Sequence, residues 1–129
     1  MERISLNALN RIHMIGIKGA GMAALAQIFV HQGKRITGSD TDEVFFTDSI
    51  LKMLHIPVRE GFSPENVPSD AEVIVYSTSY SPERNSELKA AFESGKPVLS
   101  YPEAVGVLTR VYLTLAVSGT AGKPTTSAL

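Results

Sequence analysis

A strand-like run, a glycine-rich turn and an amphipathic helix follow one another near the start of this chain. Residues 12–17 form the apolar run, and they lead into Gly19-Ala20-Gly21-Met22-Ala23-Ala24, which satisfies the pattern G-x-G-x-x-A. In such a turn the first glycine permits a tight bend, and the second lets backbone N–H groups approach a pyrophosphate. The small third residue lets the helix pack closely on the strand. One face of the helix can pack on a sheet, because apolar residues recur there at the spacing i, i+3, i+4 and i+7. These residues are Met22, Leu25, Ala26 and Phe29.

The rest of the chain continues this alternation of strand-like runs and helical periodicity. Strands are expected at residues 35–38, 71–76, 98–99 and 111–117, with a further edge strand near Val58. Alternation of this kind indicates βαβ units. The predicted fold class is therefore α/β: a Rossmann-like, open, mostly parallel sheet with helices on both faces.

Capping residues and glycines set the expected helix boundaries. Thr47 is predicted to cap one helix, and Ser81-Pro82-Glu83 is predicted to supply the cap and first two positions of another. Gly33 and Gly95 are expected to end helices in a left-handed conformation. The buried positions expected in the two capped helices are Ile50, Leu51 and Leu54 in the first and Leu88, Ala91 and Phe92 in the second.

Length and composition exclude several classes of function. A chain of 129 residues fits one domain with a hydrophobic core, and its net charge of -1 gives no electrostatic case for a nucleic acid or an anionic membrane as partner. The absence of cysteine excludes disulfides, thiolate catalysis and Cys-ligated metal sites. No apolar run is long enough for a membrane helix, and the first residues lack the pattern of a signal peptide, so the cytoplasm is the expected compartment.

Histidines and hydroxyl side chains indicate no catalytic or metal site. His13, His31 and His55 are scattered, and no spacing among them suggests a metal triad. No Ser-His-Asp arrangement is apparent. The sequence therefore assigns no catalytic residue and no metal ligand in this chain.

Candidate binding residues follow the predicted strands. Asp40 ends the second strand at the distance from the glycine turn expected of a carboxylate that accepts hydrogen bonds from ribose hydroxyls. Lys18 lies in the turn, where it could add positive charge beside a phosphate or be a solvated surface lysine. Ser77-Thr78-Ser79 ends a buried strand, so its hydroxyls could line a binding crevice or simply form a turn before a helix. A merely structural glycine turn remains the alternative to nucleotide binding.

A second glycine-rich segment lies at the other end of the chain. Gly119-Thr120-Ala121-Gly122-Lys123-Pro124-Thr125-Thr126 follows an apolar strand and resembles a phosphate-binding loop, although it is shorter than G-x-x-x-x-G-K-[ST]. Lys123 would neutralise the β and γ phosphates of a nucleotide. Pro124 stands where such a loop needs a hydroxyl for Mg²⁺, and proline offers neither a hydroxyl nor an N–H.

Four segments together resemble the N-terminal part of the Mur ligase family, from about Ile12 to the end of the chain. Their order and spacing are more specific than any one motif. They are His13-Met14-Ile15-Gly16-Ile17-Lys18-Gly19-Ala20-Gly21-Met22, Thr37-Gly38-Ser39-Asp40, Val75-Tyr76-Ser77-Thr78-Ser79 and Gly119-Thr120-Ala121-Gly122-Lys123-Pro124-Thr125-Thr126.

The resemblance implies one part of a three-domain enzyme that binds a UDP-sugar, uses ATP and Mg²⁺ and forms an amide bond. Residues 1–117 would be the Rossmann-like UDP-sugar-binding domain, and residues 118–129 the start of the ATP-binding central domain, truncated here. The family's partners for this chain would be the UDP-sugar substrate and its own central and C-terminal domains. The UDP-sugar residues implied are Lys18, Gly19, Ala20, Gly21, Met22, Ser39, Asp40, Ser77, Thr78 and Ser79. The ATP residues implied are Gly119, Thr120, Ala121, Gly122, Lys123, Pro124 and Thr125.

Within the family, the Gly-Ala-Gly-Met form of the first loop favours the branch that adds L-alanine to UDP-N-acetylmuramate over the branch that attaches a preformed murein tripeptide. The chain departs from the family pattern at Ala121, where His is usual, and at Pro124, where Thr is usual. It also departs at Phe62, where His often follows the glycine, and at Tyr101, where an Arg commonly begins the helix. A stand-alone module that senses NAD or a related dinucleotide, and a structural domain that binds nothing, are the alternatives from other classes.

Overall fold

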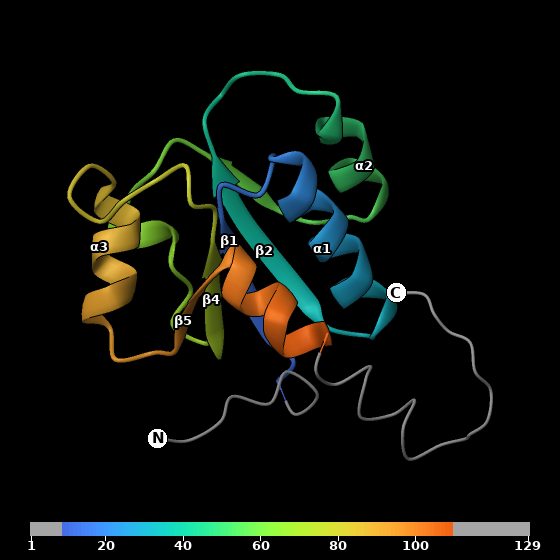
Figure 1. Cartoon of the computed structure of the whole chain (residues 1–129). Helices are drawn as coiled ribbons and strands as arrows, with labels where there is room; N and C mark the ends of the chain where they lie inside the picture. Colours follow the sequence, from blue (N-terminus) through green and yellow to red (C-terminus); the bar gives the residue numbers. More distant parts are fainter. Residues whose placement is uncertain (1–8, 110–129) are drawn as a thin grey trace, which may run out of the picture.

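A five-stranded sheet with every neighbouring pair of strands parallel runs through the middle of the molecule (Figure 1). The computed structural model describes residues 9–109. Its strands are β1 (Arg11–Ile15), β2 (Arg35–Asp40), β3 (Val58–Glu60), β4 (Val73–Tyr76) and β5 (Val98–Ser100). They lie in the order β3-β2-β1-β4-β5, so the chain builds outward from β1 on one side and then returns to build on the other. The predicted Rossmann-like α/β fold is confirmed.

Helices cover both faces of this sheet, as the sequence predicted (Figure 1). The helices are α1 (Ala20–His31), α2 (Thr47–Met53), the short 3-10 helix η2 (Pro64–Asn66), α3 (Ser86–Glu93) and a further helix over residues 101–109. Residues from α1, α2 and 101–109 share one hydrophobic cluster, and α3 contributes to a second cluster on the opposite face. Alternate residues of β1 divide between the two, Met14 in the first and Ile15 in the second, because successive side chains of a strand point to opposite faces.

The first helix has the buried face that its periodicity predicted. Met22, Leu25, Ala26 and Phe29 are all buried. Gly33 follows the end of α1 with a φ of 84°, a conformation that glycine adopts without a Cβ penalty. Gly95 has the same φ after α3. The strand before α1 ends at Ile15 rather than Ile17, because Gly16 turns the chain with a φ of 83°.

Both predicted N-caps are wrong. Thr47 is the first residue of α2, and its hydroxyl donates a hydrogen bond to the carbonyl of Lys18 (2.6 Å) instead of capping the helix. Ser81 belongs to a turn in which its carbonyl accepts hydrogen bonds from the N–H groups of Arg84 (3.1 Å) and Asn85 (2.9 Å). The side chain of Asn85 then caps α3 by accepting from the N–H of Leu88 (3.0 Å).

The buried face of α3 differs from the predicted one at two positions. Leu88 and Ala91 are buried as predicted, but Phe92 is 46% exposed and Glu87 is fully buried. Phe92 lies at the side of the helix, with its ring edge-on to Tyr76 at 5.7 Å. In α2, Leu51 is buried, whereas Ile50 and Leu54 are only partly buried.

The helix over residues 101–109 begins with a capping box. The hydroxyl of Ser100 accepts from the N–H of Glu103 (3.3 Å), and the Glu103 carboxylate accepts from the N–H of Ser100 (2.8 Å). The strand predicted at residues 111–117 lies outside the described residues. Between residues 9 and 109, every helix is too short or too polar to cross a membrane.

Candidate functional site

The N-terminus of α1 opens at the carboxyl edge of the sheet. Gly19 precedes the helix, is exposed, and leaves the helix without a side-chain cap among residues 9–109. The N–H groups of Ala20, Gly21 and Met22 occupy the first turn, where an α-helix supplies no acceptor of its own. A helix end of this kind carries partial positive charge and offers N–H donors to an anion.

A pocket of about 310 Å³ lies in front of this helix end. It is formed where β1, β2 and β4 end, at the point where the order of the strands reverses. Ligands of open α/β sheets bind at this point. We call it the site pocket. Its lining residues are Gly16, Lys18, Gly19, Ala20, Asp40, Phe45, Phe46, Ser77, Ser79 and Tyr80.

Asp40 ends β2 at the edge of the site pocket, and its carboxylate is held in place by three hydrogen bonds. Oδ2 accepts from the N–H of Lys18 (2.8 Å), and Oδ1 accepts from the N–H of Thr41 (2.7 Å) and from the hydroxyl of Tyr80 (3.3 Å). The side chain is only 4% exposed. Because an ionised carboxylate has about four acceptor positions, about one remains for a ligand.

Tyr80 lines the site pocket although sequence reasoning did not single it out. Its ring packs against Gly16, where an added Cβ would lie 2.8 Å from the ring, and edge-on to Phe62 at 4.8 Å. Burial raises the pKa of Tyr80 above its usual value, and the nearby Asp40 carboxylate raises it further. The hydroxyl is therefore a hydrogen-bond donor at neutral pH. The aromatic residue directly after Ser77-Thr78-Ser79 was the signal available in the sequence.

The structure brings some of the predicted site residues together and leaves others aside. Gly19, Ala20, Asp40, Ser77 and Ser79 line one pocket, as does Lys18. Thr78 is exposed and is not part of the lining.

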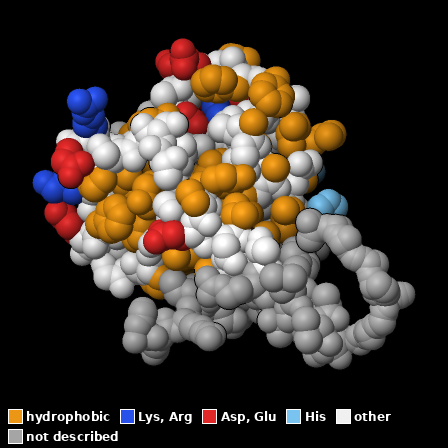
Figure 2. Space-filling view, in the orientation of Figure 1, with side chains coloured by type: hydrophobic (Ala, Val, Ile, Leu, Met, Phe, Trp, Pro, Cys, Tyr) orange, Lys and Arg blue, Asp and Glu red, His pale blue; other side chains and the backbone are white. Residues whose placement is uncertain are grey.

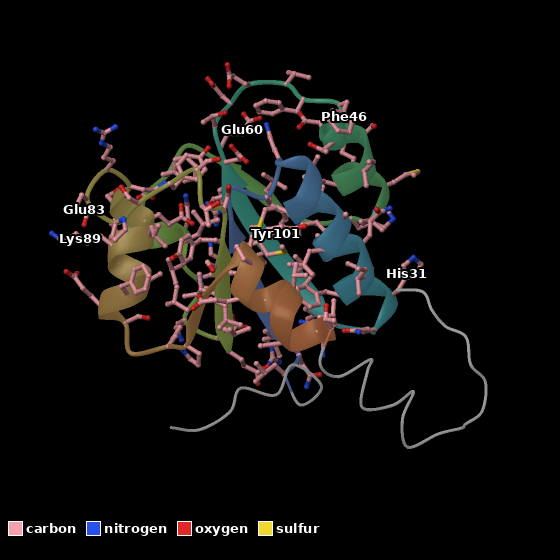
Figure 3. The ribbon with its side chains drawn as sticks, in the orientation of Figure 1. His31, Phe46, Glu60, Glu83, Lys89 and Tyr101 are labelled. Carbon is pink, nitrogen blue, oxygen red and sulfur yellow. The ribbon has the colours of Figure 1, made fainter. Side chains whose placement is uncertain are left out.

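Three further predicted residues do not line the site pocket. The side chain of Met22 is buried in the hydrophobic cluster beneath α1. Gly21 is covered by Tyr101, whose hydroxyl would lie 2.8 Å from an added Cβ. Figure 3 shows Tyr101 between the two helices that begin at this edge. Ser39 is fully buried, and its hydroxyl donates to Glu87 (2.6 Å) beneath the sheet edge.

Glu87 is the centre of a buried polar network that the sequence did not reveal. Its Oε2 accepts from Nε2 of His13 (2.6 Å) and from the hydroxyl of Ser39, and its Oε1 accepts from Asn66 (2.8 Å) and from the N–H of Ser63 (3.2 Å). Burial acts to raise the pKa of Glu87, but the hydrogen bonds from His13, Ser39 and Asn66 outweigh it and hold the pKa below its usual value. The network joins α3 and η2 to β1 and to Ser39 of β2, the residue before Asp40.

The residues predicted to bind ATP, Gly119 to Thr125, lie outside the described part of the chain. Within residues 9–109, no group of three or more His, Asp or Glu side chains is arranged to hold a metal ion.

Sheet order, helices on both faces and a pocket at the switch point define a Rossmann-like α/β domain. A family model described as "Mur ligase family, catalytic domain" matches residues 11–113. The chain belongs to the Mur ligase family. This confirms the resemblance inferred from the four sequence segments.

Relatives and a solved structure agree with this assignment. The chain is 45% identical to UDP-N-acetylmuramate–L-alanine ligase of Treponema pallidum and 48% identical to that of Desulfitobacterium hafniense; each alignment spans 119 residues and covers 92% of this chain, with 25% and 26% of the respective relatives. Among solved structures, the UDP-N-acetylmuramate:L-alanyl-gamma-D-glutamyl-meso-diaminopimelate ligase of Neisseria meningitides is 29% identical, with a TM-score of 0.68 over 76% of this chain and 30% of that one. The chain thus spans about a quarter of the length of the curated relatives it matches.

Proposed function

We propose that this chain is the UDP-N-acetylmuramate-binding domain of an ATP-dependent ligase that adds L-alanine to that sugar nucleotide in peptidoglycan precursor synthesis. The observation that carries the proposal is the uncapped N-terminus of α1, which opens into the site pocket beside Asp40. The identities of 45% and 48% to L-alanine ligases favour this branch of the family.

Each part of the site pocket has a proposed role in this binding. The N–H groups of Ala20, Gly21 and Met22 would hold the diphosphate, because they are the free donors of the first helical turn. The Asp40 carboxylate would accept a hydrogen bond from a ribose hydroxyl at its remaining acceptor position. Ser77 and Ser79 would donate to the sugar side of the ligand.

The proposed residues outside this lining act through the backbone or at its margin. Ser39 would hold the end of β2, and with it Asp40, through its hydrogen bond to Glu87. Thr78 would lie at the margin of the site, next to the two serines.

The complete enzyme is proposed to use ATP and Mg²⁺. ATP would phosphorylate the muramate carboxylate, and the amino group of L-alanine would attack the acyl phosphate and release phosphate. Gly119 to Thr125 would contribute to the ATP site through the exposed amides of the glycines and the charge of Lys123. The cytoplasm is the compartment we propose, because the reaction consumes ATP and a nucleotide sugar.

One other ligase activity is favoured by a specific observation. The fold likeness to the Neisseria enzyme, whose name gives a tripeptide as the group joined to UDP-N-acetylmuramate, supports a tripeptide ligase as second candidate. Both candidates bind the same sugar nucleotide, so only the full-length protein with L-alanine or a murein tripeptide as acceptor separates them.

Isothermal titration of the 129-residue chain with UDP-N-acetylmuramate, UDP and NAD tests the binding role. We expect heat of binding from both uridine ligands and none from NAD. Binding of NAD without a response to either uridine ligand would identify a dinucleotide-sensing module instead. No binding of any of the three would identify a structural domain.

A further inference from the structure

Among residues 9–109, Lys18 is the one lysine that lines the site pocket, and the recorded partners of its ammonium group lie in β3, in α2 and in the loop between β2 and α2. Nζ donates to the carbonyls of Glu43 (2.7 Å) and Thr41 (3.1 Å), both in the β2–α2 loop. Carboxylate oxygens of Asp48 (3.5 Å) and Glu60 (3.8 Å) complete its surroundings. Only 3% of the side chain is exposed.

These contacts leave the ammonium group little capacity for another ligand. An ammonium has three N–H donors, and two are taken by backbone carbonyls. The Asp48 and Glu60 carboxylates form ion pairs with the ammonium, and together they carry more negative charge than its single positive charge. A phosphate at the N-terminus of α1 would therefore have to compete with four existing partners for this group.

The backbone of Lys18 binds the two ends of the same loop. Its N–H donates to Asp40, the last residue before the loop, and its carbonyl accepts from the hydroxyl of Thr47, the first residue after it. Together with the ammonium contacts, all three polar groups of Lys18 fasten the segment from Thr41 to Phe46.

The fastened loop carries exposed apolar side chains to the rim of the site pocket. Phe46 is 74% exposed and Phe45 is 39% exposed, and both line the pocket. The ring of Phe45 also lies 5.9 Å from the Lys18 ammonium. Figure 2 shows hydrophobic side chains gathered over the β2–α2 loop and α2, and Figure 3 shows Phe46 at the start of α2. Aromatic faces beside an anion site suit a planar base, whose stacking is worth about 1–3 kcal/mol per base.

We propose that Lys18 is a positioning residue that holds the Thr41–Phe46 loop beside the site pocket, so that Phe45 and Phe46 form an apolar wall for the base of a nucleotide, and that it does not contact the diphosphate. The proposal rests on the proposed function for the identity of the ligand. The loop-holding role rests only on the contacts above.

Hydrogen exchange of the free chain tests the loop-holding role. We expect Lys18→Met to speed exchange of the hydrogen-bonded amides of Thr41 and Glu43 at least about fivefold, because the loop loses its ammonium contacts. Lys89→Met is the matched control, since Lys89 is exposed on α3 (Figure 3), and exchange in residues 41–46 should not change in that variant. Unchanged exchange in folded Lys18→Met would overturn the proposal.

Titration with UDP and with inorganic pyrophosphate tests the aromatic wall. We expect Lys18→Met and Phe46→Ala each to weaken UDP binding about tenfold, the loss of one stacking contact, and to leave pyrophosphate binding within about twofold. Equal losses for UDP and pyrophosphate in Lys18→Met would mean direct contact with the diphosphate and would overturn the proposal. Because Phe46 is exposed, Phe46→Ala is expected to fold even if Lys18→Met does not. Unchanged UDP affinity in Phe46→Ala would also contradict the proposed aromatic wall.

The unaltered chain separates this proposal from the proposed function. If the unaltered chain binds pyrophosphate and UDP with equal affinity, the proposed aromatic wall is contradicted and the proposed anion site is supported. If it binds neither, the proposed function and the wall both fail, and hydrogen exchange alone decides whether Lys18 holds the loop.

Discussion

At Gly19, a capping side chain would stabilise α1 but, if negatively charged, would weaken anion binding at the proposed site. Its φ of -61° and ψ of 148° suit an N-cap residue, and an added Cβ would meet its nearest neighbour at 3.7 Å, an ordinary contact. We expect Gly19→Asp to keep or raise the free energy of unfolding, by up to about 1 kcal/mol, because the carboxylate caps α1 and opposes its dipole. The same negative charge should weaken UDP binding at least about tenfold.

Denaturant unfolding of Gly19→Asp measures its change in stability, and calorimetric titration of the same variant measures its change in UDP affinity. Gly19→Ser is the neutral control: it can also cap the helix, so its stability should match that of the aspartate variant while its UDP affinity stays closer to that of the unaltered chain. Tight UDP binding by Gly19→Asp would place the diphosphate away from this helix end.

Two other glycines should respond to alanine in opposite directions. At Gly38, inside β2, an added Cβ would lie 2.6–2.9 Å from three side-chain carbons of buried Ile17, including its Cβ. We expect Gly38→Ala to lower the free energy of unfolding by about 1–3 kcal/mol, because Ile17 cannot move without disturbing the turn before α1. At Gly106, in the helix over residues 101–109, an added Cβ would meet no neighbouring side chain or other element within 4 Å in the described part of the chain, so Gly106→Ala should raise stability by about 0.5–1 kcal/mol. Urea unfolding of both variants measures the two signs, and equal effects would contradict this packing.

Residue roles could be predicted from the sequence only where local pattern determines them. The spacing from the glycine turn placed Asp40 at the pocket, because it depends on one strand-helix-strand unit. Glu87 was missed, since its partners His13 and Asn66 lie far from it in sequence and nothing in its own segment marks it as buried. For Lys18, the sequence placed a charge in the turn but could not show that loop carbonyls would bind it.

At the scale of elements, the Glu87 network attaches α3 and η2 to the sheet and makes that attachment dependent on pH. A glutamate whose pKa is lowered on folding stabilises the protein fully above its unfolded pKa, about 4.3. That contribution is lost as the pH falls through the lower pKa of the folded state. We therefore expect the free energy of unfolding to fall between pH 5 and more acidic values, measured by urea unfolding at a series of pH values. Glu72 acts in the same direction, because hydrogen bonds from the N–H groups of Asn10 and Arg11 lower its pKa.

Replacing Glu87 isolates its share of the acid dependence. Glu87→Gln should lower stability by about 2–3 kcal/mol at pH 7, since an amide cannot accept from all four donors. It should also flatten the slope of stability against pH below pH 5. Glu83→Gln, on the exposed turn before α3 (Figure 3), should do neither. An unchanged acid slope in Glu87→Gln would mean that other carboxylates cause it.

Helices were predicted best where apolar residues recur over several turns, and worst where two residues could each serve as the N-cap. α1 has a run of apolar residues at helical spacing, so its position and buried face were correct. For α3, both Ser81 and Asn85 are plausible caps, and the turn that ends at Asn85 removes Ser81 from the helix. Phe92 lies outside the core because Glu87, together with Leu88 and Ala91, occupies the buried face of α3, which no local pattern could show.

For the whole molecule, ligand binding and folding should be linked. A ligand that binds only the folded state at one hundred times its dissociation constant adds about 2.7 kcal/mol to the free energy of unfolding. We expect UDP-N-acetylmuramate at that concentration to raise the Tm of the chain by about 5–10 °C, and NAD to leave it unchanged. Thermal unfolding followed by circular dichroism measures both, and a rise with NAD alone would contradict the proposed ligand.

The position of β1 in the sheet has a consequence for biosynthesis. Ile12 of β1 pairs with Ile36 of β2 and with Val73 of β4, so β1, which is made before the other four described strands, needs a neighbour that is made much later. While the ribosome is still adding the intervening residues, one edge of β1 has open backbone groups and an apolar face next to them, the features that promote wrong association. The nascent polypeptide is consequently most dependent on shielding, by the ribosome or by a chaperone, in the interval before β4 emerges.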